Sequence, residues 1–331
     1  MTALDPVTIV AGPYYEDLHI GDVFDASPGL TLTGGHAALH QAIVGDRLRL
    51  PLDAHLAAQV VGRGQPLAHP GLVCDVAIGQ STPPTHRVIG NLFYRGLVFR
   101  RAPRIGDTLR TTTEVVALRD SSSKPAGLVV LRVRTVDQDG RPVLDFHRCA
   151  MLPTRPDANR PGHADDLDAI SAELDPGMLS ASIDNWDLAV YARLVPGGHA
   201  ESLTAGARYV TETGDTVSAA PELVRMTLNI AGAHSDPGAS GRGRRLVYGG
   251  HTIGLACSHV TRAIPNLVTV IAWRSCDHLA PVFEGDVLRS EIEVESIDAP
   301  LVDLRVRTHA DRVDGSGTDP VLDWRLIGVI A

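Results

Sequence analysis

Apolar residues fall into two kinds of run along the chain, and these runs follow the same order in both halves. Residues 71–80 and 250–260 are mostly apolar, which predicts two helices buried nearly all round. A shorter helical segment precedes each, at residues 35–44 and 219–228. Segments rich in Val, Leu and Thr follow, with partial alternation and turn signals between them, which predicts antiparallel strands. In the first half these segments are residues 88–99, 107–118, 127–137 and 142–152.

The halves also repeat each other in sequence. GRGQPLAHPG from Gly62 matches GRGRRLVYGG from Gly241, a shift of 179 residues, and GDTLRTTTEV from Gly106 matches GDVLRSEIEV from Gly285 at the same shift. Each half is therefore predicted to hold one copy of the same fold. A buried helix followed by an antiparallel meander is what a helix wrapped by a curved sheet requires, so the fold class is α+β.

The boundary between the copies is predicted from a change in composition. The stretch PTRPDANRPGHADDLD, from residue 153, is rich in Pro, Asp and Arg and has almost no apolar periodicity, which is typical of an exposed linker. We therefore predict an N-terminal domain over residues 1–152, a linker over 153–186 and a C-terminal domain over 187–331. Apolar residues at mixed spacing over 169–194 favour a helix packed across the two domains.

Composition and charge narrow the classes of partner. A length of 331 residues with 44% hydrophobic content supplies two cores, and a net charge of -9 without a dense Lys/Arg run argues against nucleic acid. Four cysteines without CxxC pairing predict reduced thiols and a cytoplasmic location. The first residues lack a signal-peptide pattern, and no apolar run is long enough to span a membrane. Zinc, P-loop and dinucleotide motifs are missing from the sequence, so no cofactor and no metal is expected.

Four motifs are informative beside this order of elements: YYEDLHIGDVF, TLTGGHAALHQAI, RRLVYGGHTIGLA and WRSCDHLAPVFEGDVLRS. On these motifs the chain resembles the MaoC-like hydratase family, and within it the mesaconyl-CoA (methylfumaryl-CoA) hydratases. The likeness covers nearly the whole chain. The resemblance implies a double hot-dog fold and a carbon-oxygen lyase that reversibly hydrates an enoyl-CoA thioester, with a branched dicarboxylic acyl group such as mesaconyl as one candidate. Pairing of two chains into a homodimer is left open.

The resemblance also implies an Asp and a His five residues apart on the loop before the central helix. In the second half, LNIAGAHSD places Asn229 and His234 at this spacing, so an amide replaces the carboxylate. His234 is then the expected general acid and base, and Asn229 would hold the water or the thioester unless it only caps a helix. Asp236 could orient the imidazole, act as a second acid, or serve a turn.

Further candidates surround the start of the second central helix. Two glycines there could let a thioester carbonyl approach the helix N-terminus, or could simply form a tight turn. Two arginines before them could pair with CoA phosphates or with a free carboxylate, or lie on a solvated surface. Two histidines complete the set as expected substrate contacts, with packing on the helix as the alternative for His251. These candidates are Gly249, Gly250, Arg244, Arg245, His251 and His278.

The first copy lacks the three imidazoles of the second. Pro51 corresponds to His234, and Leu72 and Phe99 correspond to His251 and His278, so we expect one working site per chain, on the second copy. The corresponding carboxylate, at position 46, has no evident base and is expected to bond locally. The first copy would then serve mainly as a packing partner.

Two other functions remain open from the sequence. A hot-dog thioesterase would use a carboxylate on the central helix, and Asp75 is in the first such helix. A non-catalytic acyl-CoA-binding or structural protein would explain why neither copy has the complete Asp/His pair. Release of free thiol would identify a thioesterase, and loss of the enoyl absorbance without free thiol would identify a hydratase.

Overall fold

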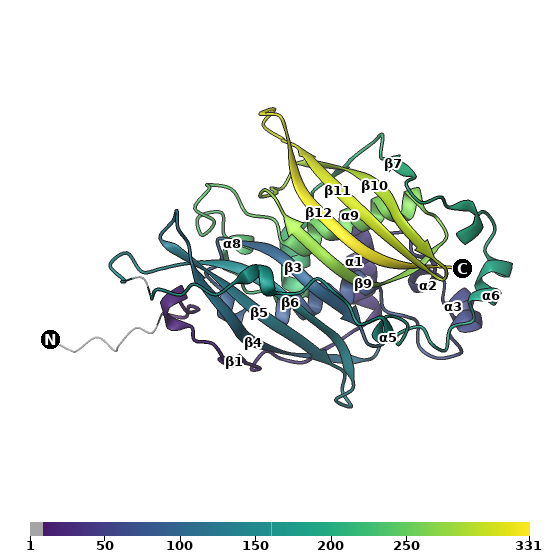
Figure 1. Cartoon of the computed structure of the whole chain (residues 1–331), viewed down its shortest axis with the longest axis horizontal. Coiled ribbons are helices and arrows are strands. Elements are labelled where there is room, and N and C mark those ends of the chain that lie inside the picture. The colour runs from purple at the N-terminus through teal and green to yellow at the C-terminus, as the bar shows by residue number, and fades with distance from the viewer. Residues whose placement is uncertain (1–8, 160) are drawn as a thin grey trace.

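Twelve strands build one continuous antiparallel sheet in the computed structural model, which describes residues 9–159 and 161–331 (Figure 1). The strands are β1 (Val23–Phe24), β2 (Leu30–Thr31), β3 (Gly90–Phe99), β4 (Thr108–Asp120), β5 (Ala126–Val136), β6 (Pro142–Pro153), β7 (Arg208–Val210), β8 (Asp215–Thr216), β9 (Leu267–His278), β10 (Val287–Asp298), β11 (Leu301–Asp311) and β12 (Thr318–Ile330). Their order is β1-β4-β5-β6-β3-β9-β12-β11-β10-β7, with β2 on β4 and β8 on β10. The halves therefore join where β3 pairs with β9.

Most of the helices pack in two groups, one against the main core of the sheet and one in a separate cluster with Val98 of β3 and Ile271 of β9. The helices are α1 (Gly34–Val44), α2 (Arg49–Leu52), α3 (Ala54–Val60), α4 (Pro70–Gln80), α5 (Pro176–Leu179), α6 (Leu188–Leu194), α7 (Ala220–Met226), α8 (Gly232–Ser235) and α9 (Gly249–Ala263). The two central helices, α4 and α9, contact each other, and residues 72–80 and 250–261 within them are all buried. This arrangement confirms the predicted double hot-dog fold. Within the described ranges, every helix is too short or too polar to cross a membrane.

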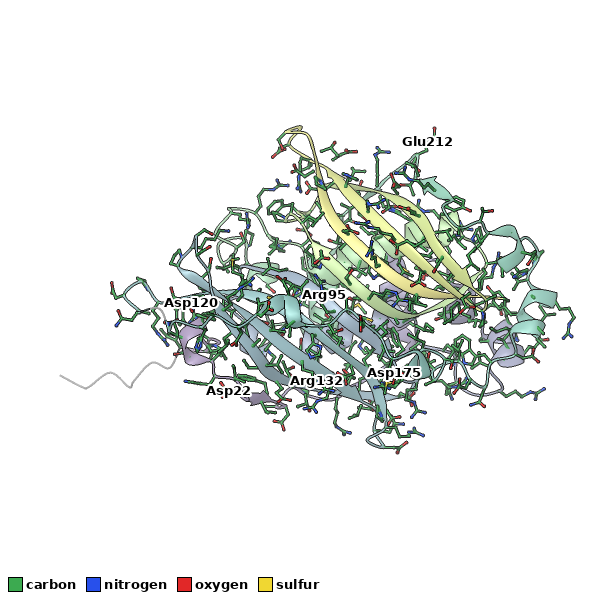
Figure 2. All side chains as sticks on the ribbon, in the orientation of Figure 1. Asp22, Arg95, Asp120, Arg132, Asp175 and Glu212 are labelled. Atoms are coloured by element: carbon green, nitrogen blue, oxygen red, sulfur yellow. The ribbon has the colours of Figure 1, made fainter. Side chains whose placement is uncertain are left out.

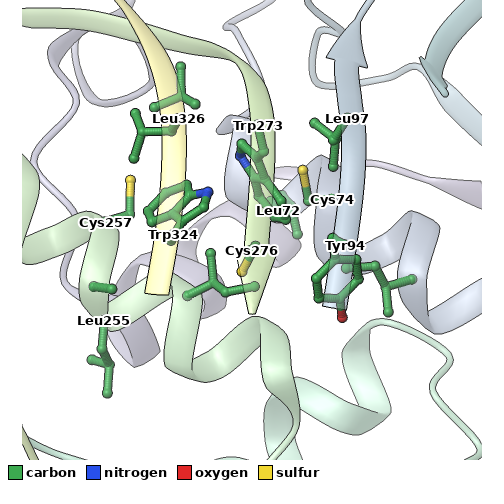
Figure 3. Close-up of a cluster of buried hydrophobic side chains, with 14 of the residues drawn as sticks. Leu72, Cys74, Tyr94, Leu97, Leu255, Cys257, Trp273, Cys276, Trp324 and Leu326 are labelled. Atoms are coloured by element: carbon green, nitrogen blue, oxygen red, sulfur yellow. The ribbon is translucent and has the colours of Figure 1, made fainter. Parts of the chain in front are cut away.

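The halves share one hydrophobic core (Figure 3). Trp273 on β9 meets Trp324 on β12 edge to face with ring centroids 5.3 Å apart, and it meets Tyr94 of the first half at 5.8 Å. All four cysteines are free and buried, and three of them (Cys74, Cys257 and Cys276) belong to this core. Because one core includes residues of both copies, neither copy would keep its core buried alone.

The opposite face of the sheet carries paired charges. Along β11 the buried and half-buried positions alternate, so the repeated LRVRT motif turns its leucine and valine inward and its arginines outward. Arg305 pairs with Asp323 at 2.6 Å, and Arg132 pairs with Asp145 in the first copy at 2.8 Å. Arg95, near the middle of the sheet in Figure 2, donates across the β3–β9 junction to Asp277 at 2.6 Å. This ion pair links the two copies on the outer face.

The segment between the copies differs from the prediction of one helix over 169–194. It holds two short helices, α5 and α6, and α6 begins where the Asp187 side chain accepts a hydrogen bond from the Val190 N–H. Tyr191 of α6 is fully buried and packs in a cluster that also contains Val98 of β3 and Ile271 of β9. The segment thus does pack across both halves. Residues 1–8, and position 160 in the predicted linker, lie outside the described residues.

Candidate active site

A cavity of about 300 Å³ lies between the two copies, and both copies supply its wall. The first copy contributes the end of α4 and parts of β3 and β6, including Tyr94 and Arg148. The second copy contributes the loop before α9, the first turn of α9 and the end of β9. Asn229, His234, Gly249 and His278 all line this one cavity, so the structure brings together four of the predicted site residues.

His234 lies on the short helix α8 and is held in one tautomer. Its Nδ1 is 2.9 Å from the carbonyl oxygen of Leu246, which can only accept a hydrogen bond, so Nδ1 carries the proton. The side chain is 9% exposed, and burial lowers its pKa to about 4. The imidazole is therefore neutral near pH 7, with the Nε2 lone pair available to accept a proton.

Asn229 lies in the loop after α7, next to Leu228, which adopts a positive φ of 59°. Its Oδ1 accepts a hydrogen bond from the Ala231 N–H at 3.0 Å and so shapes the loop that leads to α8. Because the carbonyl oxygen is engaged locally, the NH₂ group is the part of Asn229 left to contact a ligand. The side chain thus has a structural and a potential binding role at the same time.

The first turn of α9 meets the cavity at Gly249. A Cβ at this position would lie 2.7 Å from Nε2 of His278, so only glycine lets the histidine approach the helix this closely. Nε2 of His278 is buried without a hydrogen-bond partner, and burial followed by the nearby His234 lowers its pKa to about 4. The first N–H groups of a helix have no acceptor within it, so the positive end of the 15-residue helix α9 is placed at the cavity.

Arg148 on β6 is a wall residue that sequence reasoning missed. It is 3% exposed, and its Nη2 donates to the Ser81 carbonyl oxygen at 2.7 Å and to Thr85 Oγ1 at 2.9 Å. Its Nε is buried without a partner. The internal repeat could have pointed to this residue. Aligning PVLDFHR with PVLDWRL pairs Arg148 with Leu326, so a charged residue in the first copy corresponds to a buried apolar residue in the second.

Arg244 and Arg245 do not line the cavity. Arg244 lies 3.6 Å from carboxylate oxygens of Asp286 and Asp314, and Arg245 pairs with Glu284. Both guanidinium groups already have carboxylate partners, which leaves little attraction for a substrate anion. Of the alternatives left open from the sequence, this position does not favour a counter-charge to an acyl carboxylate in the cavity.

Three other predicted residues also lie outside the cavity wall. Asp236 is exposed, and its Oδ1 accepts a hydrogen bond from the Gly238 N–H at 2.8 Å. This contact is the one expected of a residue that stabilises a turn. His251 is completely buried, and because two residues along a helix turn its direction by about 200°, it points away from the face that Gly249 presents. Gly250 packs against α4, where a Cβ would lie 1.9 Å from Oδ1 of Asp75.

The corresponding region of the first copy holds an unexpected hydrogen bond between a carboxylate and a histidine. Asp46 is completely buried and lies 2.8 Å from Nε2 of His69, so the expectation that this carboxylate has no base nearby is wrong. Burial alone would raise the pKa of Asp46, but His69 and the Leu48 N–H hold it below its usual value. The hydroxyl of Thr261 on α9 is also within 3.3 Å, so this pair ties the first copy to the second. Among the described residues, no group of three or more His, Cys, Asp or Glu side chains is arranged to hold a metal ion.

Comparison with known proteins identifies the family. A family model described as mesaconyl-CoA hydratase matches residues 2–266. The mesaconyl-CoA hydratase of Cereibacter sphaeroides is 27% identical, over 94% of this chain and 91% of that protein, and the β-methylmalyl-CoA dehydratase of Chloroflexus aurantiacus is 29% identical, over 91% and 88%.

Solved structures agree with this family. A conserved hypothetical double hot-dog protein from Mycobacterium tuberculosis shares 53% identity over 97% of this chain and 99% of that chain, with a TM-score of 0.89. A putative MaoC domain dehydratase from Chloroflexus aurantiacus shares 26% identity over 96% and 97%, with a TM-score of 0.82. The chain therefore belongs to the mesaconyl-CoA hydratase family of MaoC-like double hot-dog proteins, and it is a hydratase/dehydratase of CoA thioesters.

Proposed function

We propose that the chain catalyses reversible addition of water to the double bond of an enoyl-CoA whose acyl group is a small branched dicarboxylic one, with mesaconyl-CoA as the leading candidate. The observation that carries the reaction type is the hydrogen bond from His234 Nδ1 to the Leu246 carbonyl, which leaves a neutral imidazole with a free Nε2 lone pair in the cavity wall. The names of the two curated relatives support the acyl group.

The chemical step needs one base that returns its proton. His234 Nε2 accepts a proton from water while the water oxygen bonds to the β carbon of the enoyl group and the carbon–carbon π bond breaks. The same proton then passes from Nε2 to the α carbon, so that a hydroxyl and a hydrogen have been added and the imidazole is neutral again. Asn229 holds the attacking water through its NH₂ group.

Negative charge develops on the thioester oxygen as the water adds, and the start of α9 is suited to receive it. The N–H groups around Gly249 have no acceptor within the helix and lie at its positive end. Oriented donors of this kind stabilise an enolate without reorganisation at the moment of reaction. Lys124 and Arg242 are exposed residues of the same cavity wall and suit the phosphates of CoA.

A substrate scan tests the proposed function. Purified protein is mixed with mesaconyl-CoA and crotonyl-CoA, and the loss of enoyl thioester absorbance is followed together with free thiol. Hydration removes the absorbance without releasing thiol, and thiol release would instead indicate a thioesterase. The carboxylate that a hot-dog thioesterase would use, Asp75, is 3% exposed, is not part of the cavity wall, and has a pKa raised by burial, which argues against the thioesterase. An absence of both signals would leave a binding protein.

Asn229→Ala is expected to lower kcat by about tenfold or more, because the water loses a donor and the loop before α8 loses its Oδ1 hydrogen bond. Asn229→Asp keeps an acceptor for the Ala231 N–H and is expected to retain much of the activity. Steady-state kinetics, with circular dichroism to confirm the fold, measure both. A folded but inactive Asn229→Asp protein would show that the neutral amide itself is required.

One ligand is expected to bind per chain. The cavity between the copies contains His234, whereas the first copy has Pro51 in the corresponding position and keeps Asp46 engaged with His69. Calorimetric titration with succinyl-CoA, which has no double bond to hydrate, measures the stoichiometry. Two sites of equal affinity would contradict the assignment of a single working site.

A further inference from the structure

We propose that Arg148 binds the free carboxylate of the acyl group, so that the first copy recognises the substrate on which the second copy acts. This inference rests on the proposed function for the identity of the ligand as a dicarboxylic acyl-CoA. In this proposal the positive charge opposite the acyl carboxylate belongs to Arg148 on β6 and not to Arg244 or Arg245, which precede α9.

The first reason is that Arg148 is buried without a carboxylate. The titratable groups that favour its charge are Tyr94, Tyr248 and Cys149, and its hydrogen bonds among the described residues go only to neutral oxygens. Arg312 is the informative comparison, because its side chain is 7% exposed and pairs with Asp286 at 2.7 Å and Asp319 at 2.8 Å. A buried guanidinium normally has such partners, since an uncompensated charge in a protein interior is costly.

The second reason is how Arg148 is held. Both of its protein hydrogen bonds come from Nη2 and go to neutral oxygens, at Ser81 and Thr85. Ser81 is the C-cap of α4, so its carbonyl lies at the negative end of that helix and compensates part of the charge. These contacts fix the position of the guanidinium, but they leave its remaining N–H groups for a ligand carboxylate.

The third reason is position. In a trans four-carbon dicarboxylic acid joined to CoA at one end, the carbon that receives the hydroxyl also bears the free carboxylate. The residue that binds this carboxylate must therefore lie near the base. Arg148 lines the same cavity as His234, and its charge contributes, after burial, to lowering the pKa of His234. A bound carboxylate would offset that charge and make the imidazole a better base only when the correct substrate is present.

The repeat supplies a fourth observation. Leu326 occupies the matching position in the second copy and is 1% exposed. The fold therefore packs an apolar side chain well at this place, and architecture alone does not demand an arginine. Arg148 faces the working cavity, whereas Leu326 belongs to the shared hydrophobic core.

The test compares two saturated ligands, succinyl-CoA and butyryl-CoA, which have the same chain length and differ in the terminal carboxylate. Dissociation constants are measured by calorimetry for the native protein, Arg148→Met, Arg148→Lys and the control Arg245→Met. The native protein is expected to prefer succinyl-CoA. Arg148→Met should weaken succinyl-CoA binding by about thirtyfold or more and leave butyryl-CoA binding within a few-fold, because a buried charge pair has lost one partner. Arg245 pairs with Glu284 outside the cavity, so its variant should keep the native preference.

Arg148→Lys covers the case in which the methionine variant fails to fold. Lysine keeps the charge and should retain a weakened preference for succinyl-CoA. Equal binding of the two ligands by the native protein, or an unchanged preference in a folded Arg148 variant, would overturn the inference. Neither measurement needs turnover: a native protein that prefers succinyl-CoA through Arg148 but hydrates no enoyl-CoA would refute the proposed reaction and leave this site standing.

Discussion

His234→Ala is expected to lower kcat for hydration by at least about a hundredfold, because a positioned general acid and base typically contributes about 10² to 10⁴ to the rate. The imidazole is the one group in the cavity wall whose tautomer is fixed with a free lone pair, through its Nδ1 contact to Leu246. The fold should remain intact, since the substitution removes one hydrogen bond and leaves a space at the edge of an open cavity. Stopped-flow or steady-state assays with mesaconyl-CoA measure the loss.

His55→Ala is a suitable control, because His55 is exposed on α3 and lies outside the cavity wall. It should retain native activity within about twofold, as surface substitutions usually do. A His234→Ala protein that stayed within about threefold of native kcat would exclude general acid–base catalysis by this residue.

The pH profile provides a second readout of the same assignment. With a pKa of about 4, His234 stays neutral across the physiological range, so kcat/KM should show no inflection between about pH 5.5 and 8.

The stability of the fold should also depend on pH. His234, His251 and His278 all have pKa values of about 4 in the folded chain, below the ordinary 6.5. The unfolded chain therefore takes up more protons as the pH falls, and the stability that is present above pH 6.5 is lost toward pH 4. Circular dichroism at each pH separates unfolding from protonation, and an inflection near 6.5 in folded protein would contradict a buried neutral base.

Much of the fold could be predicted because burial and sequence period agree. The LRVRT motif alternates as a half-buried strand does, and both strongly apolar runs became the buried helices α4 and α9. The prediction of one helix over residues 169–194 was wrong, because apolar residues at mixed spacing do not show where a helix is interrupted. The observed helix α6 begins only after its N-cap residue, Asp187. Patterns report local preference, and the ends of short helices depend on individual capping contacts.

The site was predicted where chemistry follows a local motif and missed where it depends on distant contacts. Asn229 and His234 have the five-residue spacing that the family resemblance implies, so the resemblance predicted a shared site. The alternatives for Arg244 and Arg245 could not be decided from the sequence, because their carboxylate partners lie about 40 or more residues further along, at Glu284, Asp286 and Asp314. Arg148 is on an apolar strand of the other copy, and only the register of the fold brings it to the cavity.

Gly249 and Gly250 should separate into a catalytic and a structural glycine when each is replaced by alanine. At Gly250 the added Cβ would lie 1.9 Å from Oδ1 of Asp75 and 2.9 Å from a ring carbon of Tyr248, and both neighbours are almost completely buried. Since neither can move into solvent, α4 and α9 must shift apart, which should lower the free energy of unfolding by about 3 kcal/mol, at the upper end of overpacking costs. Denaturant titration measures this loss.

Gly249→Ala meets only the far end of His278, with Nε2 at 2.7 Å, and that imidazole has no hydrogen bond at Nε2 to give up when it rotates. The variant should stay within about 1 kcal/mol of native stability. The new methyl group would stand where the thioester oxygen approaches the first N–H groups of α9, so kcat/KM should fall by about tenfold or more. A stable but inactive Gly250→Ala together with a fully active Gly249→Ala would contradict this assignment. That result would mean that the thioester binds at Gly250 and that α4 can move at Asp75 without loss of stability.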